Sequence, residues 1–184
     1  MINNQVGRPN YDRQINDLYC TNPIVLEKLL KYETFNNNVW ECCNGLGHLS
    51  DVLSSNGYNV RKSDIINYSD DDTEIIDFLK YENNYNGDII TNPPYKDAEA
   101  FIKKAHSVIS DGNKIAMFLK ITFLATQKRY ELFQEYPPKT IYIMSKRYSC
   151  AKNGDFENSN GTVDYCWIIW EKGYNGNTEL KWII

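Results

Sequence analysis

The feature that most constrains the fold is an alternation of strand-like and helix-like segments along almost the whole chain. Short apolar runs bounded by turn residues predict strands at 36–42, 58–64, 75–81, 87–92, 113–120, 139–145 and 164–172. Segments with apolar residues at helical spacing lie before and between these runs, at 21–33, 48–57, 97–110 and 123–133. Such alternation implies right-handed crossovers. We therefore expect a Rossmann-like, doubly wound α/β fold with a seven-stranded, mostly parallel sheet.

A long polar segment at 146–163 interrupts this alternation near the end of the chain. It exceeds the usual length of a connection, so we expect it to be functional or mobile. Its return predicts that the last strand, 164–172, runs antiparallel to its neighbours. The short apolar segment 180–184 is a candidate for an additional edge piece.

Length and charge narrow the class of protein. The 184 residues suffice for one domain with a full core, so we expect 1–184 to form a single domain, with 1–18 loose or lid-like. The formal net charge of −4 provides no overall positive field. Any contact with nucleic acid must therefore come from a local basic patch or from a partner subunit.

The cysteine count and the polar N-terminus indicate where the protein functions. The chain has five cysteines without CxxC spacing and only two histidines, and no apolar run approaches the length of a membrane span. We therefore expect reduced thiols, a cytoplasmic location, no metal site and no membrane partner.

Residues 88–95 read DIITNPPY and place two adjacent prolines directly after a predicted strand. The prolines fix two φ angles and remove two amide donors, and each disfavours helical geometry in the residue before it. The result is a stiff, extended elbow that presents Asn92 and Tyr95 in a set geometry. Such an elbow suits a site that must hold a flat, polar group.

Further polar residues follow other predicted strands. Glu41 ends the first strand and precedes the glycine turn 44–47, Asp64 ends the second strand, and Asp77 lies in the third apolar run. In a doubly wound sheet, ligands bind beyond the carboxyl ends of the strands, so these residues and the elbow should share one rim. Two glycines in a GxG pattern and the absence of a Walker lysine disfavour dinucleotides and nucleoside triphosphates. Three acids on the rim instead suit a nucleoside without phosphate that carries a sulfonium and an amine.

The ordered motifs ECCNGLG, SDI, IDF and DIITNPPY resemble those of class I S-adenosylmethionine-dependent methyltransferases. The NPPY elbow is similar to that of the amino-methylating branch, chiefly DNA N(6)-adenine methyltransferases. The stretch DLYCTNPIVLEKLL resembles the upstream cofactor-binding motif of this branch, Y-x-T-P, with Asn22 inserted. The layout resembles small phage- and prophage-encoded DNA methyltransferases and covers nearly the whole chain, without a separate target-recognition domain.

The resemblance implies roles for individual residues. It implies S-adenosylmethionine as cofactor, with the cofactor-binding residues Tyr19, Thr21, Pro23, Glu41, Asn44, Gly45, Gly47, Asp64, Ile65, Asp77, Phe78 and Asn92. In this set Asp64 takes the ribose hydroxyls, and Asp77, with Phe78 beside it, lies near the cofactor's adenine. It implies a catalytic elbow made of Asn92, Pro93, Pro94 and Tyr95.

The chemistry of the elbow follows from the substrate amine. The side chain of Asn92 and the carbonyl of Pro93 would accept hydrogen bonds from the amino group, which points its lone pair at the methyl group. Tyr95 would stack on an adenine flipped out of DNA. From the polar loop, Phe156 is a candidate second aromatic clamp, and Lys146 and Arg147 are candidates for contact with the phosphate backbone.

Each residue taken alone has a purely structural alternative. The glycines could form only a tight turn, the aspartates could cap helices, Asn92 could form an Asx turn, and Tyr95 and Phe156 could be packing residues. Other functions also stay open: methylation of RNA bases, methylation of a protein glutamine amide, or a catalytically silent cofactor-binding module or subunit of a DNA-modifying complex. The order of the motifs favours the DNA methyltransferase interpretation.

Overall fold

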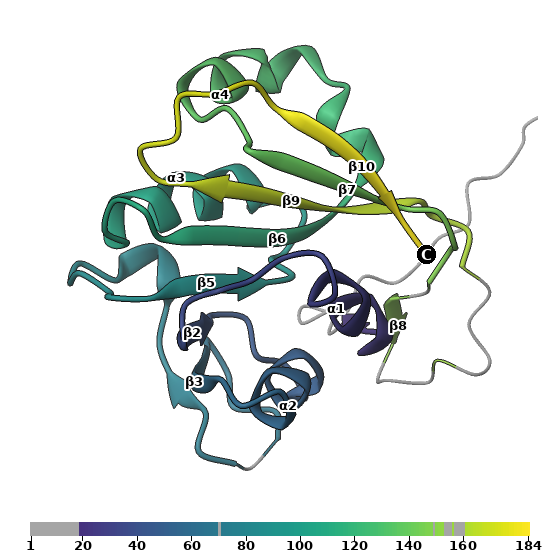
Figure 1. Ribbon diagram of the computed structural model, residues 1–184. Coiled ribbons are helices and arrows are strands. Elements are labelled where there is room, and N and C mark those ends of the chain that lie inside the picture. The colour runs from purple at the N-terminus through teal and green to yellow at the C-terminus, as the bar shows by residue number, and fades with distance from the viewer. Residues whose placement is uncertain (1–18, 70, 149, 153–155, 157–160) are drawn as a thin grey trace, which may run out of the picture.

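A computed structural model describes residues 19–69, 71–148, 150–152, 156 and 161–184. Its centre is an eight-stranded sheet with the order β10-β7-β9-β6-β5-β2-β3-β4 (Figure 1). The strands are β2 (Asn38–Glu41), β3 (Asn59–Asp64), β4 (Glu74–Ile75), β5 (Asp88–Thr91), β6 (Lys114–Lys120), β7 (Thr140–Met144), β9 (Tyr165–Glu171) and β10 (Glu179–Ile183). Only β9 runs antiparallel to its neighbours, β6 and β7. The predicted Rossmann-like α/β fold with an antiparallel strand at 164–172 is confirmed.

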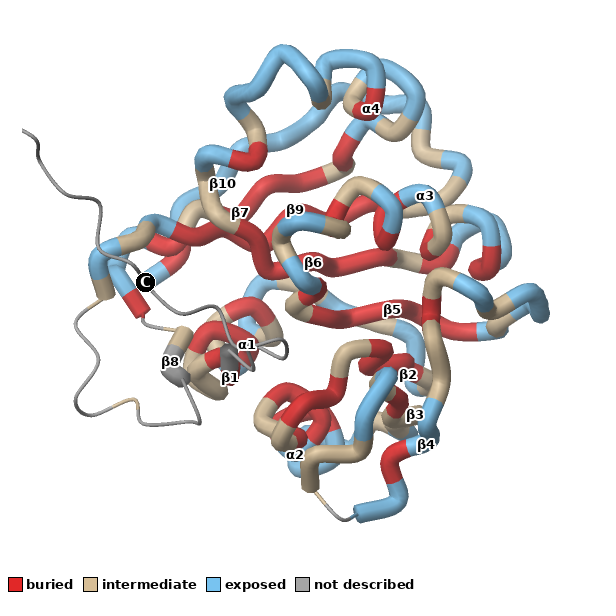
Figure 2. Tube along the Cα trace, turned by 180° about the vertical axis from the view of Figure 1, so that it is seen from behind, coloured by how far each residue is buried: buried red, intermediate tan, exposed pale blue. Residues whose placement is uncertain are grey.

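Helices cover both faces of the sheet. On one face, α1 (Ile24–Leu29) and α2 (His48–Ser55) pack on alternate residues of the strands, among them Val39, Ile90 and Phe118. On the other face, α3 (Ala98–Val108), α4 (Tyr130–Glu135) and the short 3₁₀ turns η1 (Phe78–Lys80) and η2 (Ile121–Leu124) pack on the intervening residues. Successive side chains of a strand point to opposite faces, so the central strands are buried on both sides (Figure 2).

The structure differs from the sequence prediction in three places. The sheet has one strand more than the predicted seven, because 179–183 forms β10 parallel to β7. The run 75–81 contributes only Ile75 to a strand, the two-residue β4, because the Asp77 side chain accepts the Leu79 amide and turns the chain into η1. The predicted helix 123–133 is broken at Thr126, whose extended backbone separates η2 from η3 (Gln127–Arg129) and α4.

A small antiparallel ribbon lies outside the main sheet. It pairs β1 (Tyr19–Thr21) with β8 (Cys150–Lys152), with Thr21 opposite Cys150. Figure 1 shows it beyond the carboxyl ends of the central strands, beside α1. Part of the predicted polar loop 146–163 is therefore a strand that brings the N-terminal and C-terminal thirds of the chain together.

The register of the parallel strands fixes one rim. Strands β3, β2 and β5 are neighbours and parallel, so Glu41, Asp64 and Asn92 all lie at or just beyond the same edge. No helix in the described residues is long and apolar enough to cross a bilayer.

Candidate active site

The turn between β2 and α2 forms the floor of the rim. Gly45 and Gly47 have φ angles of 54° and 84°, a region that disfavours residues with a Cβ atom. The side chain of Asn44 is buried in this turn, where its Nδ2 donates to Thr73 Oγ1 at 2.7 Å and its Oδ1 accepts from Ser50 Oγ at 2.6 Å. The Asn44 side chain therefore fixes the turn to Thr73 and Ser50. A ligand at this turn would contact its backbone.

Glu41 lies buried at the end of β2. Its Oε1 accepts hydrogen bonds from the Thr91 hydroxyl and from the Cys43 amide at 2.9 Å, whereas Oε2 is buried without a partner. Burial raises the pKa of the Glu41 carboxyl to about 8, against the opposing hydrogen bonds from Thr91 and Cys43. A buried carboxyl with one free oxygen is an acceptor that a cationic amine of a ligand would satisfy.

Asp64 sits beside the glycine turn at the end of β3. Its Oδ2 accepts the Gly45 amide at 2.9 Å and its Oδ1 accepts the Ile65 amide at 2.7 Å. Burial raises the pKa of the Asp64 carboxyl. Two exposed apolar side chains flank it. Ile65 follows it in sequence and is 59% exposed, and Ile75, which pairs with Asp64 across β3 and β4, is 73% exposed. The hydrogen bond from Gly45 thus connects Asp64 to the glycine turn, and Ile65 and Ile75 form an exposed apolar surface beside them.

The third motif is less directly placed at the rim. Asp77 caps η1 by accepting the Leu79 amide at 3.1 Å, and Lys80, at 2.9 Å, lowers the pKa of its carboxyl. Phe78 is 1% exposed and its ring stacks on Phe101 at 5.3 Å, inside the core. The Phe78 side chain is therefore a packing residue, and Asp77 makes the capping contact that its structural alternative anticipated.

The diproline elbow follows β5 and holds two acceptors that have no donor. The Asn92 Nδ2 donates to Thr21 Oγ1 at 2.7 Å, and the Asn92 Oδ1 is buried without a partner. No group among the described residues donates to the Pro93 carbonyl. The Pro94 carbonyl accepts the Asp97 amide at 2.9 Å at the start of α3. Adjacent residues therefore present two acceptors at the rim.

Tyr95 lies partly buried against both cores, and burial raises the pKa of its hydroxyl. Its hydroxyl is 3.6 Å from Cys150 Sγ, and Lys120 Nζ lies 4.8 Å from the centre of its ring. Within the described residues Lys120 has no carboxylate partner, so its ammonium rests on the aromatic face that a stacked base would need.

The β1–β8 ribbon completes the surroundings of the elbow. Thr21 is buried and meets Asn92, and Cys150 Sγ lies 4.0 Å from Asn92 Nδ2. Pro23 forms the N-cap of α1. Tyr19 pairs with Lys152 through the backbone, and its side chain lies outside what the structure describes. The upstream motif and the NPPY elbow, 71 residues apart at Thr21 and Asn92, are therefore in direct contact.

The predicted substrate residues of the polar loop lie at the same edge but are not gathered around the elbow. Lys146 and Arg147 are exposed beyond the end of β7, where Arg147 pairs with Asp164 at 2.8 Å. The Phe156 ring lies edge-on to His48 at 5.3 Å, at the start of α2 and next to the glycine turn. Phe156 therefore lies on the side of the rim that carries the glycine turn, and its role as a clamp opposite Tyr95 stays a prediction.

Three residues of the site were not singled out from the sequence. Thr91 binds Glu41, Lys120 covers Tyr95, and Cys150 contacts the elbow. Thr91 and Lys120 end strands β5 and β6, so their position at a strand end on this rim was a usable signal. Nothing in the local sequence marks Cys150. In the described parts of the chain, no group of three or more His, Cys, Asp or Glu side chains could hold a metal ion.

Comparison with solved structures identifies the fold. A protein from Listeria monocytogenes described as a class I S-adenosylmethionine-dependent methyltransferase aligns at 12% identity and TM-score 0.61, over 92% of this chain and 67% of that one. An Agrobacterium tumefaciens protein described as an O-methyltransferase aligns at 10% identity and TM-score 0.62, over 88% and 85% of the two chains. The type IIG restriction endonuclease BpuSI aligns at 14% identity and TM-score 0.55, over 84% of this chain and 24% of that one.

These identities are low, so the likeness concerns the fold alone. No protein-family model and no curated protein sequence matches the chain. The chain has the fold of class I S-adenosylmethionine-dependent methyltransferases.

Proposed function

We propose that the chain is an S-adenosylmethionine-dependent methyltransferase that acts on the exocyclic amino group of adenine in DNA. The observation that carries the proposal is the elbow, where the buried Asn92 Oδ1 and the neighbouring Pro93 carbonyl have no donor among the described residues. Buried acceptors without partners are costly and rare in folded proteins. A buried acceptor and a second free acceptor on adjacent residues suit a ligand that brings two N–H groups on one nitrogen.

The residues of the rim fit the cofactor. The unpaired Glu41 Oε2 would take the ammonium of its methionine part, and the backbone of the Gly45–Gly47 turn would lie against the same part. Asp64 would turn one carboxylate oxygen to the ribose hydroxyls, with the exposed Ile65 against the adenine. When bound, S-adenosylmethionine supplies an activated methyl group, so the protein's task is to orient the substrate and exclude water.

Asn92 and Pro93 would activate the substrate amine. Its lone pair is delocalised into the aromatic ring, and two acceptors aimed at its two hydrogens favour a pyramidal nitrogen. The bond from Asn92 Nδ2 to Thr21 commits the other end of the amide, Oδ1, to this role. An amide suffices at this position because the proton leaves from a cationic product after transfer, so no strong base is needed before it.

Lys120 supports a nucleic acid as the substrate. A base that stacks on Tyr95 would displace the Lys120 ammonium from the ring, and a nearby phosphate would receive it. Base–aromatic stacking contributes roughly 1–3 kcal/mol, which offsets part of the few kcal/mol needed to flip a base. A glutamine amide offers neither an aromatic ring nor a phosphate, which makes that alternative less favoured. An RNA base satisfies the same contacts.

The described residues offer few candidates for the recognition of a target sequence. Lys146 and Arg147 are the cations that we propose for the DNA backbone, and Arg147 is already paired with Asp164. Phosphate contacts give affinity without sequence information. We therefore propose relaxed sequence specificity, or a partner subunit that supplies the target recognition, in a cytoplasmic setting without membrane or metal.

The activity is tested by expressing the protein in a host that lacks adenine methylation and measuring N(6)-methyladenine in digested genomic DNA by mass spectrometry. The same assay with purified protein then compares DNA with RNA. Asn92→Ala should abolish methyl transfer and leave cofactor affinity intact. Asn84→Ala is the matched control, because Asn84 is exposed in the loop before β5, at the other end of the same strand. Normal cofactor binding by the wild type, with no transfer to DNA or RNA, would establish the silent-module alternative.

A further inference from the structure

Strand β10 ends the sheet with an unpaired edge among the described residues. The Glu179 amide binds the Lys139 carbonyl at 2.9 Å, and the Ile183 carbonyl accepts the Ser145 amide at 2.8 Å. These bonds aim the amides and carbonyls of 179, 181 and 183 at β7, so those of Leu180 and Trp182 point outward. A free edge of this kind is a template for pairing with another strand.

One face of this edge strand carries exposed apolar side chains. Leu180 is 50% exposed and Trp182 65%, and both lie on the face covered by α3 and α4, because they pair with Ile141 and Ile143. Ile184, directly after β10, is 67% exposed. Natural edge strands are ordinarily protected from pairing by unpaired charges or proline, whereas the two charges of β10, on Glu179 and Lys181, form an ion pair with each other. Two exposed apolar side chains on a strand with a free edge, followed by the exposed Ile184, therefore indicate a surface that is covered in solution.

We infer that β10 pairs antiparallel with β10 of a second copy of this chain, about a two-fold axis that passes midway between the two Leu180 residues. In this register the two Leu180 residues exchange backbone hydrogen bonds across the axis, and Glu179 of each copy lies opposite Lys181 of the other. Both charged side chains are about half exposed, at 58% and 49%, and they form an ion pair with each other along the strand. Opposite charges directly across an antiparallel pair stabilise it, whereas like charges destabilise it.

The same register places Trp182 of each copy opposite Thr178 of the other. Thr178 lines an open hollow of about 480 Å³ together with Leu124, Phe133, Pro137, Pro138 and Ile141, and the polar residues Gln134 and Asn177 line it as well. Directly opposite residues in an antiparallel pair point to the same face, so Trp182 enters on the side of this hollow. A tryptophan anchor seated in a pocket is common near the centre of a protein interface, and its ring and N–H suit a pocket of mixed lining. Charge pairing and pocket position, two separate observations, thus select one register.

Antiparallel pairing about this axis reverses the direction of the second sheet. The carboxyl ends of the strands, and the candidate active sites with them, then face opposite ways. The dimer leaves each site accessible and independent, so methylation per chain should not depend on dimerisation. A failed dimer test therefore says nothing against the proposed activity, and a missing activity says nothing against the dimer.

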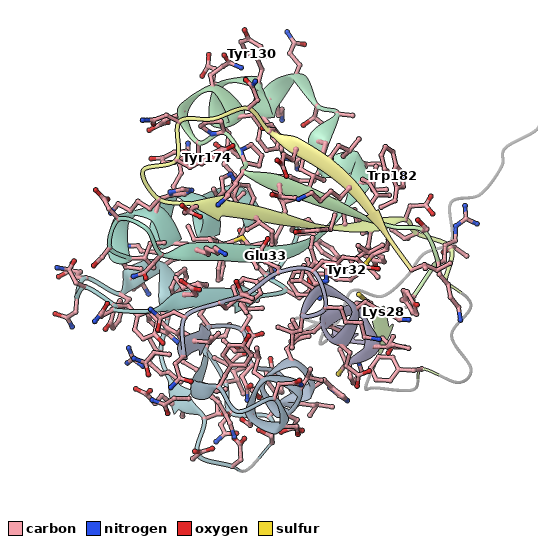
Figure 3. The ribbon with its side chains drawn as sticks, in the orientation of Figure 1. Lys28, Tyr32, Glu33, Tyr130, Tyr174 and Trp182 are labelled. Carbon is pink, nitrogen blue, oxygen red and sulfur yellow. The ribbon has the colours of Figure 1, made fainter. Side chains whose placement is uncertain are left out.

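Sedimentation equilibrium of the full chain tests the interface. The wild type should approach twice the chain mass of 21.5 kDa as concentration rises. Trp182→Ala should weaken dimerisation at least tenfold. Ile75→Ala is the control, since Ile75 is 73% exposed but lies on β4, at the opposite edge of the sheet from β10, which carries Trp182 (Figure 3). A wild type that stays monomeric, or a dimer that Trp182→Ala leaves unchanged, would overturn the inference.

A charge experiment tests the register itself. Glu179→Lys and Lys181→Glu each create like charges across the axis, so each variant alone should be monomeric. Mixed together, the two variants restore both opposite-charge pairs between chains and should form a heterodimer. The like charges along each strand persist in the mixture, so only contacts between copies can explain the recovery. If each variant dimerises alone as well as the wild type does, the register is wrong. Circular dichroism confirms that each variant is folded.

Discussion

The hydroxyl of Thr21 accepts a 2.7 Å hydrogen bond from the side-chain amide of Asn92 across 71 residues of sequence. The contact joins the β1–β8 ribbon to the diproline elbow. It also decides which end of the Asn92 amide faces the substrate, because an amide that donates to Thr21 keeps its oxygen free.

Thr21→Val removes this acceptor while keeping the shape of the side chain. We expect the methylation rate to fall roughly tenfold, because losing one hydrogen bond costs about 1–1.5 kcal/mol and the Asn92 amide can then rotate. Single-turnover rates at saturating cofactor measure the effect. Thr21→Ser keeps the hydroxyl and should recover most of the rate. Equal rates for Thr21→Val and the wild type would mean that Thr21 does not position Asn92.

Glu41 should make the protein less stable as pH rises. Burial raises its pKa to about 8 in the folded state, above the ordinary glutamate value of 4.5. Between these values the folded state keeps a proton that the unfolded state has lost, so the free energy of unfolding falls by up to about 1.4 kcal/mol per pH unit. Above pH 8 both states are ionised and the loss levels off.

Urea unfolding of the wild type and Glu41→Gln at pH 5 and pH 8 isolates this effect from the other titrating groups. The glutamine cannot ionise, so the variant should gain stability relative to the wild type at pH 8 compared with pH 5. An identical pH dependence for both proteins would show that Glu41 is ionised in the folded state at neutral pH.

Strand ends could be predicted from sequence because they follow from periodicity. The run 113–120 became β6 and 164–172 became β9 almost residue for residue, and parallel neighbours then brought Glu41, Asp64 and Asn92 to one edge. Three consecutive residues have no detectable period, so the pairing of Thr21 with Cys150, 129 residues apart by number, was not predictable.

The placement of side chains in short apolar runs could not be predicted from the sequence either. Phe78 follows an acidic residue in a motif that resembles a cofactor contact, yet it packs on Phe101 in the core. Burial of a large aromatic outweighs any local preference for the rim. Similarly, the position of Lys120 on the Tyr95 ring depends on the neighbourhood of β5 and β6, which only the assembled sheet creates.

Cofactor binding at pH 7 should release a proton from Glu41. The free carboxyl, with its pKa of about 8, is mostly protonated at this pH. A bound ammonium at Oε2 favours the ionised form and lowers the pKa, so the proton passes to the buffer. Calorimetric titration with S-adenosylmethionine in phosphate and in Tris should give binding enthalpies that differ by the ionisation enthalpies of the buffers.

The proton release should disappear in Glu41→Gln and diminish at pH 9, where the free carboxyl is already ionised. Any protonation change of the cofactor itself is common to both proteins and cancels in their difference. A buffer dependence that is the same in the variant and the wild type would place the ammonium away from Glu41.

Lys120 should contribute one phosphate contact to nucleic-acid binding. In the free protein its ammonium rests 4.8 Å from the Tyr95 ring centre, without a carboxylate partner among the described residues. Each phosphate that a cation neutralises releases counterions, so Lys120→Gln should lower the slope of log affinity against log salt by about 1. Fluorescence anisotropy with a labelled oligonucleotide, measured over a range of salt concentrations, gives this slope directly.

Lys96→Gln is the matched control, since Lys96 adjoins Tyr95 in sequence but is 84% exposed and lies 3.7 Å from Asp97. If Lys120→Gln weakens binding without changing the slope, Lys120 supports the Tyr95 ring and does not contact phosphate.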